Sequence, residues 1–188
     1  MGLFQWTLES DSSSSLCLDL GLADYNPTVL QLVTLPNLLL SWAQVAKRDS
    51  WEAEGDLEID EDLLQAFLNA LESHRITLSF FSGAWSSEFV QLVVSEMGSG
   101  SAGLTIIGAE TIYSPTALKA FADTLVGLLK SMPIGEKSSL IAAKKVYFGV
   151  GGSMEDFCDM VRSEGLQVEP IREESDGVRR AVVEVKMP

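Results

Sequence analysis

Carboxylate side chains end or follow two of the apolar segments that the sequence predicts as strands. Asp24 ends the run "LGLAD", and Glu110 follows "LTIIGA". A carboxylate can accept two hydrogen bonds at once, so one placed at a strand end suits a ligand with hydroxyl groups. A third predicted strand leads into "SGAW" (82–85), and three such strand ends could line one pocket at the carboxyl edge of a sheet. The alternative for Asp24 is a simple turn into the helix that starts at Pro27.

The elements that position these residues follow an alternating pattern, which is typical of an α/β fold. Strands are expected at residues 16–22, 76–81, 103–109, 139–148, 166–172 and 178–186. Helices are expected at about 27–46, 63–71, 85–97, from 115 onwards, and at 153–162. Asp176-Gly177 is a turn signal, so the last two strands should form a hairpin. We expect one domain over 1–188, with a mostly parallel sheet, one antiparallel strand near an edge, and an acidic surface loop at 49–62.

Residue types at the helix starts support these assignments. Asn26, Ser114 and Ser153 are good N-caps, and proline follows the first two of them at the first helical position. Pro36 should kink or shorten the helix that starts at Pro27. The spacing predicts the apolar face of that helix as Val29, Leu32, Val33, Leu39 and Leu40. The face of the next helix is predicted as Leu63, Leu64, Phe67, Leu68 and Leu71.

Composition excludes several classes of protein. The chain has 188 residues, 46% of them hydrophobic, which is enough for one domain with a substantial core. No apolar run is expected to reach membrane-spanning length, and the first residues do not have the pattern of a signal peptide. The two cysteines, Cys17 and Cys158, have no metal-ligand neighbours at a useful spacing. A reduced, cytosolic or nuclear protein without a metal site fits this composition best.

The acidic charge is unevenly distributed. The net charge is −14, and residues 1–115 hold 16 acidic and 3 basic side chains, whereas residues 116–188 hold 11 and 10. An acidic surface repels phosphate backbones, so direct binding of nucleic acid is not expected. The same surface would attract a basic protein. The excess acid could instead serve solubility alone, and composition leaves both interpretations open.

Three motifs suggest chemistry that their surroundings do not support. "GSGSAG" (98–103) spells the dinucleotide motif, but a helix precedes it and a strand follows, so we interpret it as a connector. "FGVGGSMEDF" (148–157) lacks the third glycine and the Lys-Ser/Thr of a phosphate loop, and we expect a loop that shapes a pocket. His74, the one histidine, follows a predicted helix and should help to end it. No G-x-S-x-G elbow accompanies it for hydrolase chemistry.

Four segments together resemble one enzyme family. "ADYNPTVLQLVTLPN", "SGAW", "ETIYSP" and "YFGVGG" are similar to segments of the protein-histidine methyltransferases, which use S-adenosylmethionine, and the likeness covers nearly the whole chain. The resemblance implies a Rossmann-like class I methyltransferase sheet with a final antiparallel strand. It also implies methylation of a histidine in a basic protein, because known members modify a large-subunit ribosomal protein and occur in cytoplasm and nucleus.

The resemblance also implies which residues bind the cofactor. Asp24 would take the ribose, Trp85 would line the adenine side, and Asn26 would serve mainly as a helix cap. The full set expected at S-adenosylmethionine is Asp24, Tyr25, Asn26, Gly83, Ala84, Trp85 and Ala109.

Glu110 and Tyr113 are the residues implied at the acceptor histidine. A free histidine side chain has a pKa of about 6.5, so at pH 7 most of it is neutral and already nucleophilic. The protein must therefore supply alignment and a fixed tautomer rather than a strong base. Glu110 could accept the N–H of the imidazole nitrogen that is not methylated, while Tyr113, Tyr147 and Phe148 could wall the pocket. Each has an ordinary alternative: Glu110 as an acid at a helix start, and the aromatic residues as core.

Two features depart from the family pattern. Ala84 stands in "SGAW" where the family often has an acidic residue. The family's first strand and glycine-rich loop have no counterpart, so we expect the sheet to lack its first strand and the chain to start inside the first helix, at 3–8. The alternative function is therefore an impaired or inactive methyltransferase-like module that binds a basic protein.

Overall fold

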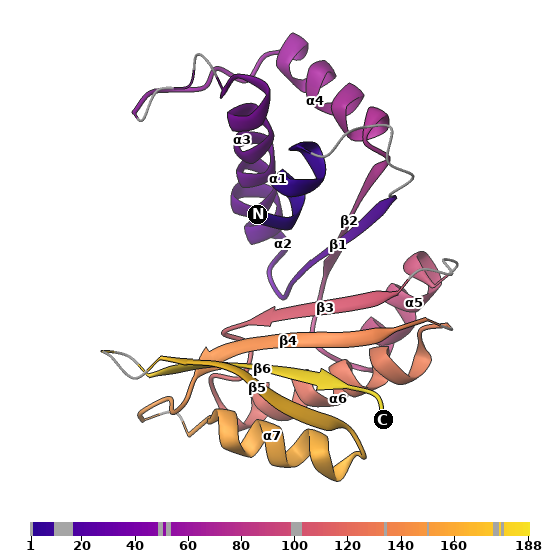
Figure 1. Cartoon of the computed structure of the whole chain (residues 1–188), viewed down its shortest axis with the longest axis vertical. Helices are drawn as coiled ribbons and strands as arrows, with labels where there is room; N and C mark the ends of the chain where they lie inside the picture. The colour runs from indigo at the N-terminus through magenta and orange to yellow at the C-terminus, as the bar shows by residue number, and fades with distance from the viewer. Residues whose placement is uncertain are drawn as a thin grey trace. The chain divides into compact units, whose positions relative to one another are not determined.

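The computed structural model describes residues 2–9, 17–48, 51, 54–98, 103–133, 135–149, 151–174, 177 and 179–188. The chain divides into two compact units, Met1–Gly83 and Ala84–Pro188, and each is described by itself (Figure 1). Both units combine strands with helices, so the α/β class expected from the sequence is confirmed. The expectation that residues 1–188 form one domain stays a prediction.

Unit 1 (Met1–Gly83) contains a two-stranded parallel sheet. Its strands are β1 (Leu18–Asp24) and β2 (Ile76–Ser82), paired so that Asp24 lies opposite Ser82. Its helical elements are α1 (Gly2–Glu9), α2 (Pro27–Val29), the π-helical segment η1 (Leu30–Thr34), α3 (Leu35–Ala46) and α4 (Glu61–Ser73). Side chains of α1, α3, α4 and β2 form the core of this unit, where the ring centroids of Trp42 and Phe67 lie 5.4 Å apart.

The helix from Pro27 to Ala46 is continuous, but it winds more widely just before Pro36. The N–H of Leu35 donates to the carbonyl of Leu30, five residues back, and this π turn accommodates a proline that has no N–H of its own. The wider turn rotates the apolar face. Leu32 and Val33 are 66% and 51% exposed, and of the predicted face only Leu39 is buried. The residues buried in its place are Leu30, Leu38, Trp42 and Ala43.

By length and composition this 20-residue helix could cross a membrane, since its most apolar window has a mean hydropathy of 1.4. The sequence analysis predicts, in contrast, that no apolar run reaches membrane-spanning length. Core helices of soluble proteins have the same length and composition, however. Of that window 33% is buried, and the buried side chains of α3 pack in one cluster with those of α1 and α4.

Helix α4 begins after the N-cap Asp60, two residues earlier than predicted, and ends at His74. The Asp60 carboxylate accepts the N–H of Leu63 at 2.8 Å, and His74 ends the helix, which confirms its expected role. Leu64 and Leu68 are exposed, contrary to prediction, because the inward face is narrower and consists of Leu63, Phe67 and Leu71. The acidic loop is also shorter than predicted, since residues 61 and 62 belong to α4, and residues 49, 50, 52 and 53 lie outside the described residues.

Unit 2 (Ala84–Pro188) contains a four-stranded sheet in the order β3-β4-β6-β5 (Figure 1). β3 (Leu104–Ala109) and β4 (Lys137–Lys144) are parallel, whereas β6 (Arg180–Lys186) is antiparallel to both β4 and β5 (Gln167–Glu174). The expected C-terminal hairpin, with its antiparallel strand next to an edge, is thus confirmed. Residues 99–102 of the predicted connector and Asp176 of the predicted turn lie outside the described residues.

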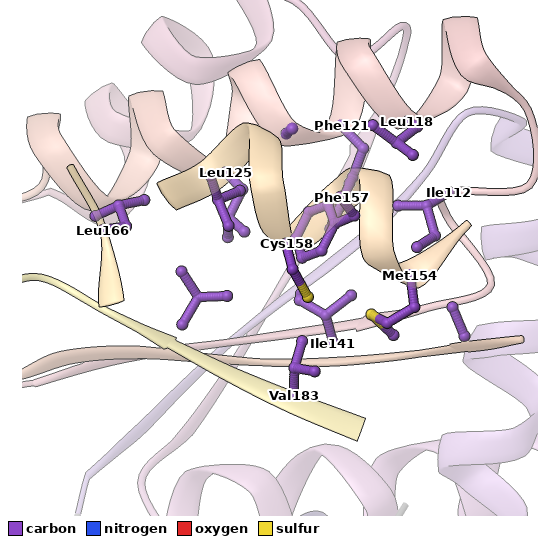
Figure 2. Close-up of a cluster of buried hydrophobic side chains, with 14 of the residues drawn as sticks. Ile112, Leu118, Phe121, Leu125, Ile141, Met154, Phe157, Cys158, Leu166 and Val183 are labelled. Atoms are coloured by element: carbon purple, nitrogen blue, oxygen red, sulfur yellow. The ribbon is translucent and has the colours of Figure 1, made fainter. Parts of the chain in front are cut away.

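The core of unit 2 brings helices α6 (Pro115–Ser131) and α7 (Met154–Ser163) onto this sheet, while α5 (Ser87–Met97) packs on α6. In Figure 2 the side chains of Phe121, Phe157 and Val183 point into the same space from α6, α7 and β6. The inward face of α6 follows helical spacing and is fully buried, and its residues include Leu118, Phe121, Ala122, Leu125 and Leu129. Burial of each large side chain contributes about 1.5–3 kcal/mol, so this cluster anchors the strand ends described next.

Candidate functional site

Asp24 is the last residue of β1, where the chain turns towards α2. Its Oδ1 accepts the backbone N–H of Asn26 at 2.8 Å, and the Asn26 side chain in turn accepts the N–H of Thr28 at 2.9 Å. The role of Asn26 as a helix cap is thus confirmed. Among the described residues no hydrogen bond to Oδ2 of Asp24 is found, so this oxygen can still accept one. Asp24 therefore makes a turn and also keeps an acceptor for a ligand hydroxyl.

Gly83 lies beside Asp24 in unit 1. Its N–H donates to the Asp24 carbonyl at 3.4 Å, and its φ of 146° is one that residues with a side chain rarely adopt. Tyr25 follows Asp24 and is 70% exposed, so its ring is free to cover a ligand. Unit 1 thus brings together four of the residues predicted at the cofactor, namely Asp24, Tyr25, Asn26 and Gly83.

Trp85 is packed into unit 2 by two aromatic neighbours. Its ring meets Phe89 and Phe121 edge-on, with centroids 5.0 and 6.0 Å away. It also borders a groove of about 870 Å³ along α5 and α6. Ala84 is exposed. The prediction that Asp24, Trp85 and Glu110 line one pocket draws on both units and stays a prediction.

Glu110 directly follows β3, after Ala109, and its carboxylate is contacted on both oxygens. The Tyr147 hydroxyl donates to Oε2 at 2.8 Å, and Nε of Arg180 lies 3.5 Å from Oε1. The Glu110 N–H extends the sheet ladder by donating to the carbonyl of Ala142 at 2.9 Å. Its φ is 56°, in the left-handed region that costs residues other than glycine about 1–2 kcal/mol. Strain of this kind clusters at functional sites.

Tyr147 is buried and stays protonated. Burial and, after it, the hydrogen bond to Glu110 raise the pKa of Tyr147 to about 12. The N–H of Lys144 donates to the Tyr147 hydroxyl oxygen at 3.3 Å, and Nζ of Lys144 lies 5.4 Å from the ring centroid. At neutral pH the phenol is thus a fixed hydrogen-bond donor.

The glycine-rich loop after β4 packs on the chain itself. A Cβ on Gly152 would lie 2.3 Å from the Ile112 carbonyl oxygen and 2.9 Å from the Ser114 nitrogen, so only glycine fits. The Tyr147 N–H donates to the Gly152 carbonyl at 2.9 Å, which ties the loop to the tyrosine. The two distinctive segments "ETIYSP" and "YFGVGG" therefore pack together, and this packing places Tyr147 against Glu110.

The strand before this loop is shorter than predicted. β4 ends at Lys144 rather than at Phe148, because Val146 pairs with Ser153 in an isolated bridge and the chain turns back at Gly149 and Gly151. Phe148 is consequently 91% exposed. Tyr113 is also exposed, at 54%, so its ring is not part of the core.

A cavity of about 960 Å³ lies beside Tyr147. Tyr147 and Phe148 border it, but neither Glu110 nor Tyr113 is among its lining residues. The prediction that these four residues share one acceptor pocket stays a prediction. Burial raises the pKa of the Cys158 thiol, which also faces this cavity, so the thiol is a poor nucleophile. Within the described ranges, no cluster of His, Cys, Asp and Glu side chains is arranged to hold a metal ion.

Arg180 is the contact that sequence reasoning missed. It starts β6 and pairs in register with Lys144, the last residue of β4, which puts it beside the strand ends. The sequence does predict a strand at 178–186, which contains Arg180. Arg180 can be placed near Glu110 only once the strand order is known.

Comparison with known proteins gives several relatives. The chain is 33% identical over 180 residues to histidine protein methyltransferase 1 of Saccharomyces cerevisiae, a match that covers 86% of this chain and 47% of that protein. It is 38% identical over 135 residues to the Schizosaccharomyces pombe protein of the same name, covering 71% and 38%. The Bos taurus homolog is 29% identical over 163 residues, covering 86% and 40%. The chain thus spans less than half the length of these relatives.

Other comparisons add less. No protein-family model matches the chain. Among solved structures, a fibrillarin pre-rRNA processing protein of Methanococcus jannaschii superposes with a TM-score of 0.45 at 12% identity, covering 91% of this chain and 66% of that one. A pericyclic reaction enzyme gives 0.45 at 11% identity, covering 98% and 47%. Scores of this size support no conclusion, whereas the sequence matches show that most of the chain is similar to histidine protein methyltransferases.

Proposed function

We propose that the chain acts as an S-adenosylmethionine-dependent methyltransferase that modifies a histidine in a basic protein. The observation that carries the proposal is the 33% identity to the Saccharomyces cerevisiae protein over 86% of this chain. The antiparallel β6, placed between β4 and β5, supports the finer assignment to the class I methyltransferase sheet.

The Asp24 carboxylate of unit 1 fits the hydroxyl groups of the cofactor's ribose. Asp24 keeps Oδ2 as an acceptor while Oδ1 holds the turn, so the turn would persist when a hydroxyl is bound. Hydrogen bonds to an ionised carboxylate are about twice as strong as those between neutral groups. When bound there, S-adenosylmethionine would supply a methyl group on a sulfonium; transfer to an imidazole nitrogen would exchange the S–CH₃ bond for an N–CH₃ bond and leave S-adenosylhomocysteine.

Glu110 is the residue that we assign to the acceptor. Its side chain is 46% exposed, so an incoming imidazole can reach it. By accepting the N–H of the nitrogen that is not methylated, Glu110 would hold the imidazole in the tautomer whose other nitrogen is the nucleophile. Methylation makes the ring cationic, and Glu110 would stabilise that charge until the N–H proton passes to solvent.

The partner that we propose is a basic protein, with a ribosomal protein as the specific candidate. The charge of residues 1–115 supports a basic partner, because they hold 16 acidic and only 3 basic side chains. Action in the cytoplasm and nucleus belongs to the same proposal. The competing function is a binding module that holds a basic protein without methyl transfer, and the same charge distribution favours it.

Titration of the purified chain with S-adenosylhomocysteine tests the cofactor half of the proposal. Asp24→Asn keeps a side-chain oxygen for the turn but loses the charge and the second acceptor, so the Kd should rise about tenfold or more. Asp19→Asn is the matched control, an exposed acid on the same strand, and should bind as the wild type does. No binding by the wild type where the Saccharomyces cerevisiae relative binds, or equal binding by Asp24→Asn, would contradict the proposal.

A further inference from the structure

We propose that Tyr147 and Arg180 are positioning residues, which hold the Glu110 carboxylate from two sides so that it offers a fixed acceptor to the imidazole N–H. The inference rests on the proposed function and extends it to two residues that act on the acceptor through Glu110. All three side chains belong to unit 2 and come from different segments: the end of β3, the loop after β4, and the start of β6.

The orientation of the Tyr147 hydroxyl is fixed by its surroundings. Tyr147 as a whole is 7% exposed. Its backbone N–H donates to the Gly152 carbonyl, and the Gly151 N–H donates to the Tyr147 carbonyl at 3.1 Å. The phenol oxygen already accepts the N–H of Lys144, so its own proton is directed to Oε2 of Glu110. The donor is thus in place before any ligand binds.

Arg180 contacts the other carboxylate oxygen. Its Nε lies 3.5 Å from Oε1, and the guanidinium is charged at every accessible pH. Contacts to two different oxygens fix the plane of the carboxylate, which a single contact would not do. An ionised carboxylate has about four lone-pair positions, so two occupied positions leave others for a ligand N–H.

A purely structural role for the Glu110–Arg180 salt bridge does not explain why a glutamate stands at this position. A half-exposed salt bridge on a surface contributes only about 0–1 kcal/mol, and the glutamate that makes it here has a φ of 56°. Glycine would avoid that strain at this position, but it could not provide a carboxylate. An acid therefore stands in a conformation that its backbone disfavours.

Kinetics of methyl transfer with three variants test the inference. Tyr147→Phe removes only the hydroxyl, and Arg180→Gln removes the charge, so each should lower kcat about 10- to 100-fold while KM for S-adenosylmethionine stays within about twofold. Arg180→Lys should keep most of kcat, because it keeps a cation near Oε1. The matched control is Arg172→Gln on β5, an exposed arginine that pairs with Glu174 at 2.9 Å, and it should leave kcat unchanged.

A double mutant separates positioning from stability. If Tyr147 acts through Glu110, Tyr147→Phe should have no further effect on kcat in a Glu110→Gln background. Wild-type kcat in both Tyr147→Phe and Arg180→Gln, or the same loss in the Glu110→Gln background, would overturn the inference. If the wild type transfers no methyl group where the Saccharomyces cerevisiae relative does, the proposed function itself fails.

Ultraviolet titration of the tyrosinate tests the contact without turnover. The difference between wild type and Tyr147→Phe isolates Tyr147, and among the described residues the charged groups that face it are Glu110, Arg180 and Lys144. Glu110→Gln should lower the pKa of Tyr147 from about 12, because the carboxylate that accepts its proton is lost. An unchanged titration would show that Tyr147 does not donate to Glu110, and would overturn the inference whatever the turnover.

Discussion

The hydroxyl of Tyr147 donates a 2.8 Å hydrogen bond to Oε2 of Glu110, 37 residues away in the sequence. The bond links the residue after β3 with the loop after β4, and Arg180 adds the start of β6 to the same carboxylate. Strand order, a glycine contact at Gly152 and one left-handed residue are all needed to bring these side chains together. The glycine contact and the left-handed residue can each be tested by substitution.

Stability at alkaline pH should depend on Tyr147. The pKa of Tyr147 is raised in the folded protein from 10.0 to about 12, so folding favours the neutral phenol. This contribution is complete below pH 10 and is lost as the pH rises from about 10 to 12, and it amounts to about 2–3 kcal/mol. Over that range the free energy of unfolding should fall less in Tyr147→Phe than in the wild type. Denaturant titrations at a series of pH values measure it, and parallel pH dependences would contradict it.

Glycine at position 110 should be more stable than alanine. Both substitutions remove the carboxylate, but only glycine adopts a φ of 56° without strain, so Glu110→Gly should exceed Glu110→Ala by about 1 kcal/mol in free energy of unfolding. At the exposed Gln91 in the middle of α5 the order should reverse, since glycine destabilises a helix by a similar amount. Denaturant unfolding compares the four variants, and the same order at both positions would be the contrary result.

Gly152 should tolerate no side chain. A Cβ there would lie 2.3 Å from the Ile112 carbonyl oxygen, so Gly152→Ala should cost about 3 kcal/mol or more and separate the loop from its support. Gly149→Ala is the control: its Cβ would meet nothing within 4 Å, and only the φ of 78° would cost about 1 kcal/mol. Thermal and denaturant unfolding distinguish them, and equal losses would show that the contact at Gly152 is relaxed easily.

Local residue chemistry accounts for what the sequence predicted well. The caps at Asn26, Ser114 and Ser153 and the end at His74 depend on nearby atoms only, and they occur as expected. The buried face of the helix from Pro27 was predicted wrongly, because a π turn before Pro36 shifts its phase and no periodicity reveals that.

The candidate site was predictable only in part, because some of its contacts join residues far apart in the sequence. Asp24 and Glu110 could be placed at strand ends from their neighbours in sequence. The partners of Glu110 could not, because Arg180 reaches it only when β6 pairs with β4, and Tyr147 only through the close contact at Gly152.

Association with a basic partner should slow as salt rises. Exposed charges are screened over about 10 Å at 0.1 M ionic strength, and the exposed acids of the loop before α4 would attract the partner from a distance. Neutralising Glu54, Asp56 and Glu58 should lower the association rate and weaken its salt dependence. Neutralising the exposed Glu136, Glu155 and Glu169 of unit 2 removes the same charge and should have a smaller effect. Stopped-flow kinetics measure both, and a rate indifferent to salt would exclude electrostatic attraction.

Locating the methylated residue in a substrate protein tests the proposed function most directly. Large-subunit ribosomal proteins would be incubated with S-adenosylmethionine and this chain, with the Saccharomyces cerevisiae relative as positive control, and the methyl group located by tandem mass spectrometry. We predict methylation on a histidine ring nitrogen, reduced about 10²-fold or more by Glu110→Gln and unchanged by Glu164→Gln, an exposed acid that pairs with Lys130. A methyl group on another residue type, full activity of Glu110→Gln, or no transfer where the yeast protein is active would contradict the proposed function.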